Sequence, residues 1–274
     1  MLPVVTHVHR IDEVPEGISP KKNALTHVIP LVNGEVVMTT DADCCPEPGW
    51  ISSMVAAMDD RDLVAGYSPF GRRETLGGKL LALETLSQAF LAMSGIGIGR
   101  PITCAGRSFA YRKEVFEKVG GFGEKAMRTL TGDDNFFLIR AVSRGYRAAY
   151  CTAKDSFVWT DPPGSWRRFV NQRTRVLSGS QHLTWDVAAL GGVAYLWLAT
   201  MFLGMLFLQP AAWAAFGAKF ILDLFSMSIA ATRLREWRLM LVYPLTEILY
   251  LPYFLAFGAL GTFGTYDWKG RKGS

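Results

Sequence analysis

The chain has 274 residues, half of them hydrophobic, and its mean hydropathy is +0.17. This length suits one ordinary domain plus an additional segment. The net charge of +5 does not indicate nucleic-acid binding, because the basic residues gather beside the most apolar parts of the chain, at 166–175, 233–238 and 268–272. A lipid bilayer, and not nucleic acid, is therefore the expected partner of the basic residues.

Residues 1–185 alternate predicted strands and helices. Strands are expected at 2–9, 35–40 and 62–70, helices at 21–32, 46–58 and 76–94, and a strand turning into a short helix at 104–122. This alternation indicates an α/β fold with a doubly wound, mostly parallel sheet, in which ligands sit beyond the carboxyl ends of the strands.

Residues 186–274 form a predicted membrane region. It contains three apolar segments long enough to cross a bilayer as helices, at about 187–208, 211–231 and 239–263. The second segment carries Lys219 and Asp223, whose spacing of four allows an ion pair on one helix face. The third carries Glu247 and is interrupted by Pro244 and Pro252.

The basic clusters also predict a topology. If residues 1–185 are cytoplasmic, the first span leads out and the second returns, so that 233–238 lies inside the cell, as the positive-inside rule requires. A third full span would place 268–272 outside, so we expect 239–263 to be a re-entrant or interfacial segment. The chain is expected in the inner membrane of the cell.

The four cysteines do not form a zinc module or a disulfide framework. Cys44 and Cys45 are adjacent, Cys104 and Cys151 stand alone, and the chain has no C-x-x-C. We expect reduced, mostly buried thiols in a reducing compartment.

The stretch VVMTTDADCCPEPGW at 36–50 places two carboxylates, Asp41 and Asp43, at the end of an apolar run. Such a D-x-D can hold a divalent metal that binds a diphosphate, can supply a phosphatase nucleophile and acid, or can begin an Asx turn. The phosphatase pattern fails here, because Cys45 and Phe137 occupy positions where that family has Thr or Val and a magnesium-binding aspartate. The metal site and the turn both remain open.

Five segments, in order, resemble glycosyltransferase family 2, which has the GT-A fold. They are EGISPKKNALTHVI (16–29), GEVVMTTDADCCPEPGWI (34–51), CAGRSFAYRKEVFEKVGGF (104–122), LTGDDNFFLIRAVSRGYRAAY (130–150) and NQRTRV (171–176). The resemblance implies a GT-A catalytic domain with a mixed, doubly wound sheet, followed by membrane helices. It also implies an inverting transfer of sugar from a UDP- or GDP-sugar to a lipid or cell-envelope acceptor, assisted by Mg²⁺ or Mn²⁺.

The resemblance assigns the donor side to the first two segments. Asp43 would be the metal ligand, and Asp41 would bind the metal or lie towards the ribose. Lys21 and Asn23 would lie near the donor, although a lysine in this position is also compatible with a solvated loop.

The later segments carry the chemistry and the membrane-side contacts. Asp134 would be the general base that accepts the acceptor hydroxyl's proton, with Asp133 beside it, although adjacent carboxylates also suit a helix N-terminus. Gln172 and Arg175 would contact the donor diphosphate, or the Arg cluster would only anchor the chain to lipid headgroups. Val176 replaces the tryptophan of the family's Q-x-x-R-W, which favours a single transfer over polymer synthesis.

The chain departs from the family at its start. Members begin with a strand–helix–strand unit that forms the pocket for the base, and residues 1–20 contain no such unit. We therefore expect an N-terminally truncated enzyme that is inactive and poorly folded alone, the alternative being a catalytically incomplete remnant or a subunit that needs a separate N-terminal half.

Overall fold

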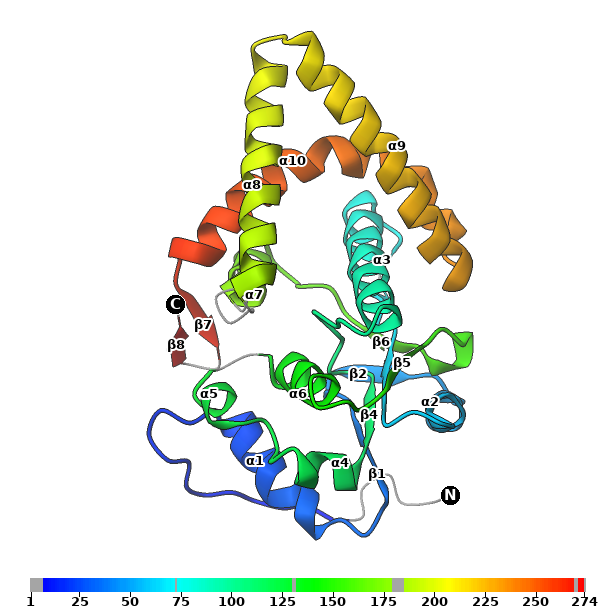
Figure 1. The fold of residues 1–274 in the computed structure, drawn as a ribbon, viewed down its shortest axis with the longest axis vertical. Coiled ribbons are helices and arrows are strands. Elements are labelled where there is room, and N and C mark those ends of the chain that lie inside the picture. The colour runs from blue at the N-terminus through cyan, green and yellow to red at the C-terminus, as the bar shows by residue number, and fades with distance from the viewer. Residues whose placement is uncertain (1–6, 72, 130–131, 179–184, 269–270, 274) are drawn as a thin grey trace.

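The structure is a computed structural model that describes residues 7–71, 73–129, 132–178, 185–268 and 271–273 (Figure 1). The first part of the chain contains α1 (Pro20–Val28), η1 (Ile29–Leu31), β1 (Val36–Thr39), β2 (Cys44–Pro46), α2 (Trp50–Met58), β3 (Leu63–Gly66), α3 (Leu76–Gly97), β4 (Phe109–Arg112), α4 (Lys113–Lys118), α5 (Glu124–Met127), α6 (Asp133–Val142), β5 (Ala148–Cys151), η2 (Lys154–Ser156), β6 (Val158–Thr160) and α7 (Trp166–Ser178). The second part contains α8 (Trp185–Leu206), α9 (Pro210–Arg233), η4 (Trp237–Val242), α10 (Tyr243–Phe263), β7 (Tyr266–Trp268) and β8 (Arg271–Gly273).

The main sheet has four strands in the order β1-β4-β3-β5. β4 is antiparallel to both β1 and β3, while β3 and β5 are parallel. The predicted mixed α/β architecture is therefore confirmed, but the expectation of mostly parallel pairing is wrong. β1, β3 and β5 run in the same direction, yet β4 lies between β1 and β3, so only β3 and β5 make parallel hydrogen bonds.

The strands of the structure differ from the predicted strands in two places. Residues 7–9, the described part of the strand expected at 2–9, are not in a strand, and 2–6 lie outside the described residues. The short strand β2 was not predicted. It pairs with β6, which lies more than a hundred residues later, with Cys44 opposite Thr160 and Pro46 opposite Val158.

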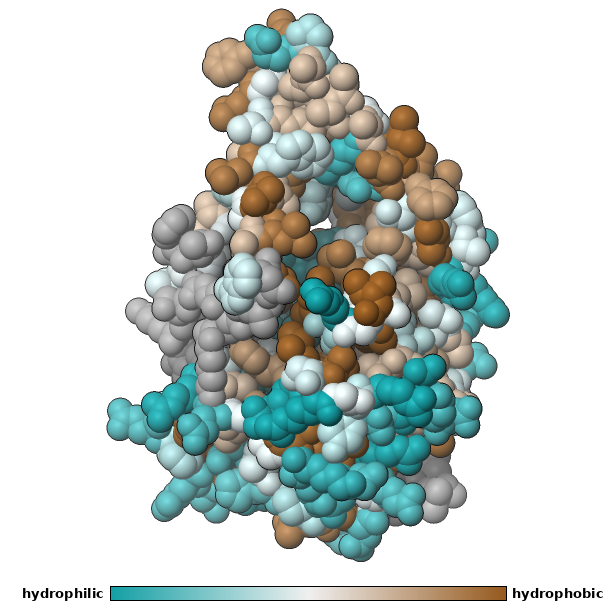
Figure 2. Space-filling model, viewed as in Figure 1, coloured by the Kyte–Doolittle hydropathy of each residue, from teal (hydrophilic) through white to brown (hydrophobic). Residues whose placement is uncertain are grey.

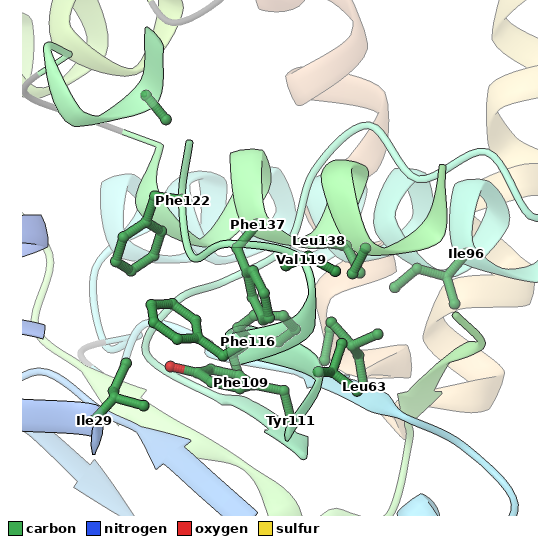
Figure 3. Packing of buried hydrophobic residues seen from close by; sticks show 14 residues of the cluster. Ile29, Leu63, Ile96, Phe109, Tyr111, Phe116, Val119, Phe122, Phe137 and Leu138 are labelled. Carbon is green, nitrogen blue, oxygen red and sulfur yellow. The ribbon is translucent and has the colours of Figure 1, made fainter. Parts of the chain in front are cut away.

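An aromatic cluster fixes α6 on the sheet (Figure 3). The ring of Phe137 lies 4.7 Å from that of Tyr111 on β4 and 5.2 Å from that of Phe116 on α4. Phe109 and Phe122 also contact Phe137, which is completely buried. Phe137 is therefore a core residue, which gives a structural reason for an aromatic side chain where the phosphatase pattern requires an aspartate.

All three predicted membrane segments are helices that are long and apolar enough to span a bilayer, at Val187–Leu206, Pro210–Arg233 and Trp237–Gly261. Figure 1 shows α8 and α9 as a hairpin that extends away from the strands, and Figure 2 shows this end of the molecule as mostly apolar. The structure adds a fourth candidate, α3, which satisfies the same criteria.

The helix α3 joins the sheet to the membrane region. It packs against β5, η4 and α9. Leu83 and Leu86 of α3 share one buried cluster with Tyr67, which follows β3, and with Ala230 and Leu234 at the end of α9. Because these residues exclude water together, the sheet and the end of α9 form one continuous core.

Buried ion pairs reinforce this connection. Arg73 donates from both terminal nitrogens to the carboxylate of Glu236, at 2.7 and 2.9 Å. Arg173 on α7 is buried and pairs with Glu84 on α3, and the hydroxyl of Tyr253 on α10 donates to the other Glu84 oxygen at 2.8 Å. Buried charges with missing partners are costly, so these pairs specify how α7, α3 and α10 meet.

The membrane helices contain a further charged cluster. Lys219 donates to Asp223 at 2.6 Å, which confirms the predicted pair, and also contacts Glu247 on α10. α10 follows η4, contains Pro252, and packs its second half on α7 through Tyr253 and Phe257. The start of α10 thus lies beside η4 and its second half beside α7, an arrangement compatible with the re-entrant course expected for this segment.

We predict that Phe137→Ala lowers the free energy of unfolding by about 3–5 kcal/mol, because it opens a cavity among the rings of the aromatic cluster. Thermal or denaturant unfolding of the detergent-solubilised chain measures this loss. Ile51→Ala removes a side chain that is 61% exposed and should change stability by about 0.5 kcal/mol or less. A loss for Phe137→Ala as small as that of the control would contradict the core assignment.

Candidate functional site

The first acid pair lies in the turn between β1 and β2. The turn is closed by the backbone, since the N–H of Cys44 donates to the carbonyl of Asp41 at 3.1 Å. The side chains of Asp41, Asp43 and Cys44 each offer a ligand atom, and these atoms lie within 4.8 Å of one another. The turn alternative therefore accounts for the backbone but leaves the two carboxylates available to bind a ligand.

These residues fit a hard divalent cation. Burial raises the pKa of the Cys44 thiol, so the thiol stays protonated and is a poor ligand. The useful donors are the carboxylates of Asp41, which is half-buried, and Asp43, which is exposed. A site with one or two carboxylates suits Mg²⁺ or Mn²⁺, which keep several positions for water and substrate phosphates.

The second acid pair, Asp133 and Asp134, occupies the first turn of α6 after Gly132, whose φ is +74°. The loop that precedes β4 holds this turn: the side-chain oxygen of Asn135 accepts a hydrogen bond from the Cys104 N–H at 2.7 Å. A Cβ atom at Gly106 would lie 2.7 Å from Asp134 Oδ2. Glycine at 106 is therefore what allows the Asp134 carboxylate to approach this loop.

The environment of Asp134 disfavours its charge. Burial, followed by repulsion from Asp133, raises the pKa of Asp134 to about 6, although Lys21 and backbone hydrogen bonds act in the opposite direction. A helix N-terminus stabilises carboxylates, but here burial and the neighbouring carboxylate outweigh that effect.

Lys21 connects the two acid pairs. Its ammonium lies 3.3 Å from Asp41 Oδ1 and 3.1 Å from Asp133 Oδ2. Burial acts to lower the pKa of Lys21, but the charges of Asp133, Asp41 and Asp134 outweigh it and raise the pKa. The structure thus brings together four of the predicted site residues, Lys21, Asp41, Asp133 and Asp134, with Asp43 beside Asp41.

The next lysine along α1 was not singled out by the sequence. Lys22 is completely buried and donates to the carbonyls of Ala126 and Thr129, at 2.7 and 2.9 Å. Burial lowers the pKa of Lys22 to about 8. Lys22 therefore ties α1 to the loop that leads into α6. Helical periodicity could have predicted different environments for Lys21 and Lys22, since adjacent positions of a helix face different directions.

Asn23 lies in a different environment from Lys21. It is buried, and its side-chain Nδ2 has no hydrogen-bond partner among the described residues. It lines a cavity of about 650 Å³ together with residues 12–15 and His27. Its predicted contact with a donor stays a prediction.

Gln172 and Arg175 lie on α7, which packs on α10 and on β7. The Gln172 side-chain oxygen is buried and has no partner within the part of the chain that is described. Both residues lie on the helix that Arg173, missed by the sequence reasoning, holds against Glu84. Their contact with a diphosphate stays a prediction.

Comparison with known proteins establishes the class of this protein. The sequence model of glycosyl transferase family 21 matches residues 3–272, and the chain therefore belongs to that family. The predicted class is confirmed, whereas family 21 is a different family from family 2, whose motifs the five segments resemble, and membership of family 2 is not confirmed.

Two curated relatives support the same class. The chain is 28% identical over 178 residues to the probable glycosyltransferase YdaM of Bacillus subtilis (strain 168), a match that covers 63% of this chain and 41% of that protein. It is 35% identical over 68 residues to the O-antigen chain rhamnosyltransferase WbaN of Salmonella anatum, which covers 25% of this chain and 20% of that protein. The matches thus span less than half the length of either relative.

We predict that Asp134→Asn stabilises the folded chain at pH 7.5. The pKa of Asp134 is raised from 3.8 to about 6 in the folded state. As the pH rises through this range, ionisation of Asp134 lowers the free energy of unfolding of the wild type. The Asp134→Asn variant has no ionisable group at this position and does not lose this stability. The melting temperature of the variant should exceed that of the wild type by about 2–4 °C or more at pH 7.5. The difference should shrink as the pH falls to about 4.

Asp43→Asn is the control for this experiment, because Asp43 is exposed. Its melting temperature should follow that of the wild type across the same pH range. An Asp134→Asn variant that melts at or below the wild-type temperature at pH 7.5 would show that the ionised carboxylate is not disfavoured.

Proposed function

We propose that the chain is a membrane-bound inverting glycosyltransferase that moves a sugar from a UDP- or GDP-sugar to a lipid or cell-envelope acceptor, with Mg²⁺ or Mn²⁺ as cofactor. The observation that carries this proposal is the junction of two acid pairs by Lys21, with Asp41 on one side of its ammonium and Asp133 on the other. One pair suits a metal-bound diphosphate and the other suits proton removal.

The donor side is formed by Asp41 and Asp43. These carboxylates would hold the cation, which neutralises charge that develops on the departing diphosphate. The ammonium of Lys21 lies 3.3 Å from Asp41 and can stabilise a phosphate oxygen beside the cation. Fixed positive charge at this place favours departure of the nucleoside diphosphate because the charge on the leaving group increases in the transition state.

The acceptor side is formed by Asp134. In an inverting transfer the acceptor hydroxyl attacks the anomeric carbon from the face opposite the leaving group, and a carboxylate accepts its proton. A pKa of about 6 leaves Asp134 ionised at neutral pH and still basic enough to accept a proton. Asp133 keeps Lys21 next to this base through the 3.1 Å contact.

The membrane helices support an acceptor that resides in or on a bilayer. Four of the described helices are long and apolar enough to span it, and α3 packs this region against β5 of the main sheet. The name of WbaN assigns to that protein a role in the O-antigen chain, which is an envelope glycan. The basic cluster at 233–238 favours an inner membrane location with the sheet on the cytoplasmic side.

Two substitutions test the proposed roles. We predict that Asp43→Ala removes most metal-dependent sugar transfer from UDP- or GDP-sugars to extracted membrane lipids. Asp134→Asn should lower the transfer rate by about 10²–10⁴-fold, the usual contribution of a general base. The activity of the wild type should rise with pH through about 6, where Asp134 ionises. Product formation from radiolabelled donors in membrane vesicles measures all three effects.

Asp60→Asn is a matched control, because Asp60 is an exposed carboxylate that pairs with Arg147 away from the acid pairs. It should keep wild-type activity. Undiminished transfer in Asp43→Ala would contradict the metal site, and a near wild-type rate in Asp134→Asn would contradict the base. Absence of transfer from wild-type chain with every donor would favour the alternative, a subunit that needs a separate half.

We predict that Gly106→Ala lowers the transfer rate at least tenfold while the chain still folds. The added methyl group would lie 2.7 Å from Asp134 Oδ2 and must displace that carboxylate, and small displacements of a catalytic group carry large losses of rate. Gly77→Ala is the control, since no atom lies within 4 Å of the corresponding position. Equal activity of the two variants would show that Asp134 tolerates the shift.

A further inference from the structure

We propose that the ammonium of Lys21 and the divalent cation compete for Asp41, so that cation binding transfers Lys21 from Asp41 to the bound diphosphate. This inference rests on the metal site of the proposed function, and it concerns a step that precedes the sugar transfer. The observation behind it is the double contact of one ammonium with carboxylates from both acid pairs.

The charges around Lys21 explain why this contact exists. Four carboxylates, of Asp41, Asp43, Asp133 and Asp134, gather in this part of the structure. Lys22 also lies near them, but its ammonium is bound to backbone carbonyls at 2.7 and 2.9 Å, and the charge of Arg107 acts on Cys44 beside Asp43. Lys21 therefore neutralises carboxylates from both pairs, and a divalent cation would add positive charge on the side of Asp41 and Asp43.

The two contacts of Lys21 differ in exposure. Its partner Asp133 has a side chain that is 16% exposed, whereas that of Asp41 is 43% exposed. Ion pairs weaken as water reaches them, so the contact with Asp41 is the weaker one and opens first. Asp41 is also the residue that lies within 4.8 Å of a second carboxylate, Asp43. The Asp41 carboxylate would thus serve Lys21 in one state and the cation in the other.

A cation on Asp41 and Asp43 would repel the ammonium of Lys21, which stays anchored on Asp133. The displaced ammonium would then be free to bind a phosphate oxygen of a diphosphate held by the cation. An anionic ligand attracts both charges, so the cation and the diphosphate should each increase the affinity for the other. Lys21 consequently opposes binding of the cation alone and supports binding of the cation with a diphosphate.

The test measures Mn²⁺ binding to the full chain in detergent without nucleotide, by electron paramagnetic resonance of the free ion. Lys21→Met should bind Mn²⁺ about three- to tenfold more tightly than the wild type, because it removes a partly exposed ion pair and a nearby positive charge. UDP should show the opposite order of affinities. In the presence of Mn²⁺, Lys21→Met should bind UDP more weakly than the wild type does. UDP affinity at saturating Mn²⁺ is the second readout.

Lys118→Met is the matched control, because it makes the same charge change on α4, where Lys118 pairs with Glu114 on the surface. It should leave Mn²⁺ affinity unchanged. Lys21→Arg keeps the positive charge and should bind Mn²⁺ as weakly as the wild type. Compared with Asp41→Asn alone, the double variant of Lys21→Met with Asp41→Asn should show no gain in Mn²⁺ affinity, since the contact that Lys21 opposes is already absent in the single variant.

The outcomes separate this inference from the proposed function. In one outcome, the wild type binds Mn²⁺, Asp43→Asn abolishes this binding, and Lys21→Met binds Mn²⁺ no more tightly than the wild type. This outcome overturns the exchange and leaves the metal site intact. Mn²⁺ binding that is absent, or insensitive to Asp43→Asn, overturns the metal site itself. A measurement on the wild type covers the case of a variant that fails to fold: Mn²⁺ should increase acylation of Lys21 relative to Lys118, and an unchanged ratio overturns the proposal.

Discussion

The position of β4 between β1 and β3 is the constraint on which the site depends. β4 pairs with β1 so that Thr39 lies opposite Phe109, and the Thr39 hydroxyl donates to the carbonyl of Gly106 at 2.8 Å. The loop that enters β4 is thereby fixed beside the end of β1, where the D-x-D begins. The same loop receives α6 through the hydrogen bond between Asn135 and Cys104, so one antiparallel strand brings both acid pairs to the same place.

Hydrophobic packing and electrostatics act on opposite ends of α6. Phe137 anchors the helix in the aromatic core, while Asp133 and Asp134, one turn earlier, are held close to each other and to Lys21. Burial, followed by repulsion from the Asp133 carboxylate, disfavours ionisation of Asp134 and raises its pKa. The rigid core therefore supports an electrostatically unfavourable arrangement, which is typical of sites that carry out chemistry.

The membrane region shares its core with the sheet. The cluster around Leu83, Ala230 and Leu234 is continuous from the sheet side to the end of α9, and the pairs of Arg73 with Glu236 and of Arg173 with Glu84 surround it. Truncating either partner of such a pair would leave a buried charge without compensation. The orientation of the sheet relative to the membrane helices is consequently determined by packing and by these ion pairs.

The sequence by itself determined the mixed α/β class and the three apolar segments after residue 185, because these depend on local composition and periodicity, and it singled out the two acid pairs that the structure brings together. It also identified the class of enzyme through five motifs in order. It did not reveal the insertion of β4, the β2–β6 pair or the role of α3, since strand order and helix partners depend on contacts between residues far apart in the chain. Only the tertiary structure decided that Lys21 contacts the acids and that Lys22 is buried. The two lysines lie on different faces of α1, and the elements that pack against α1 determine which face is buried.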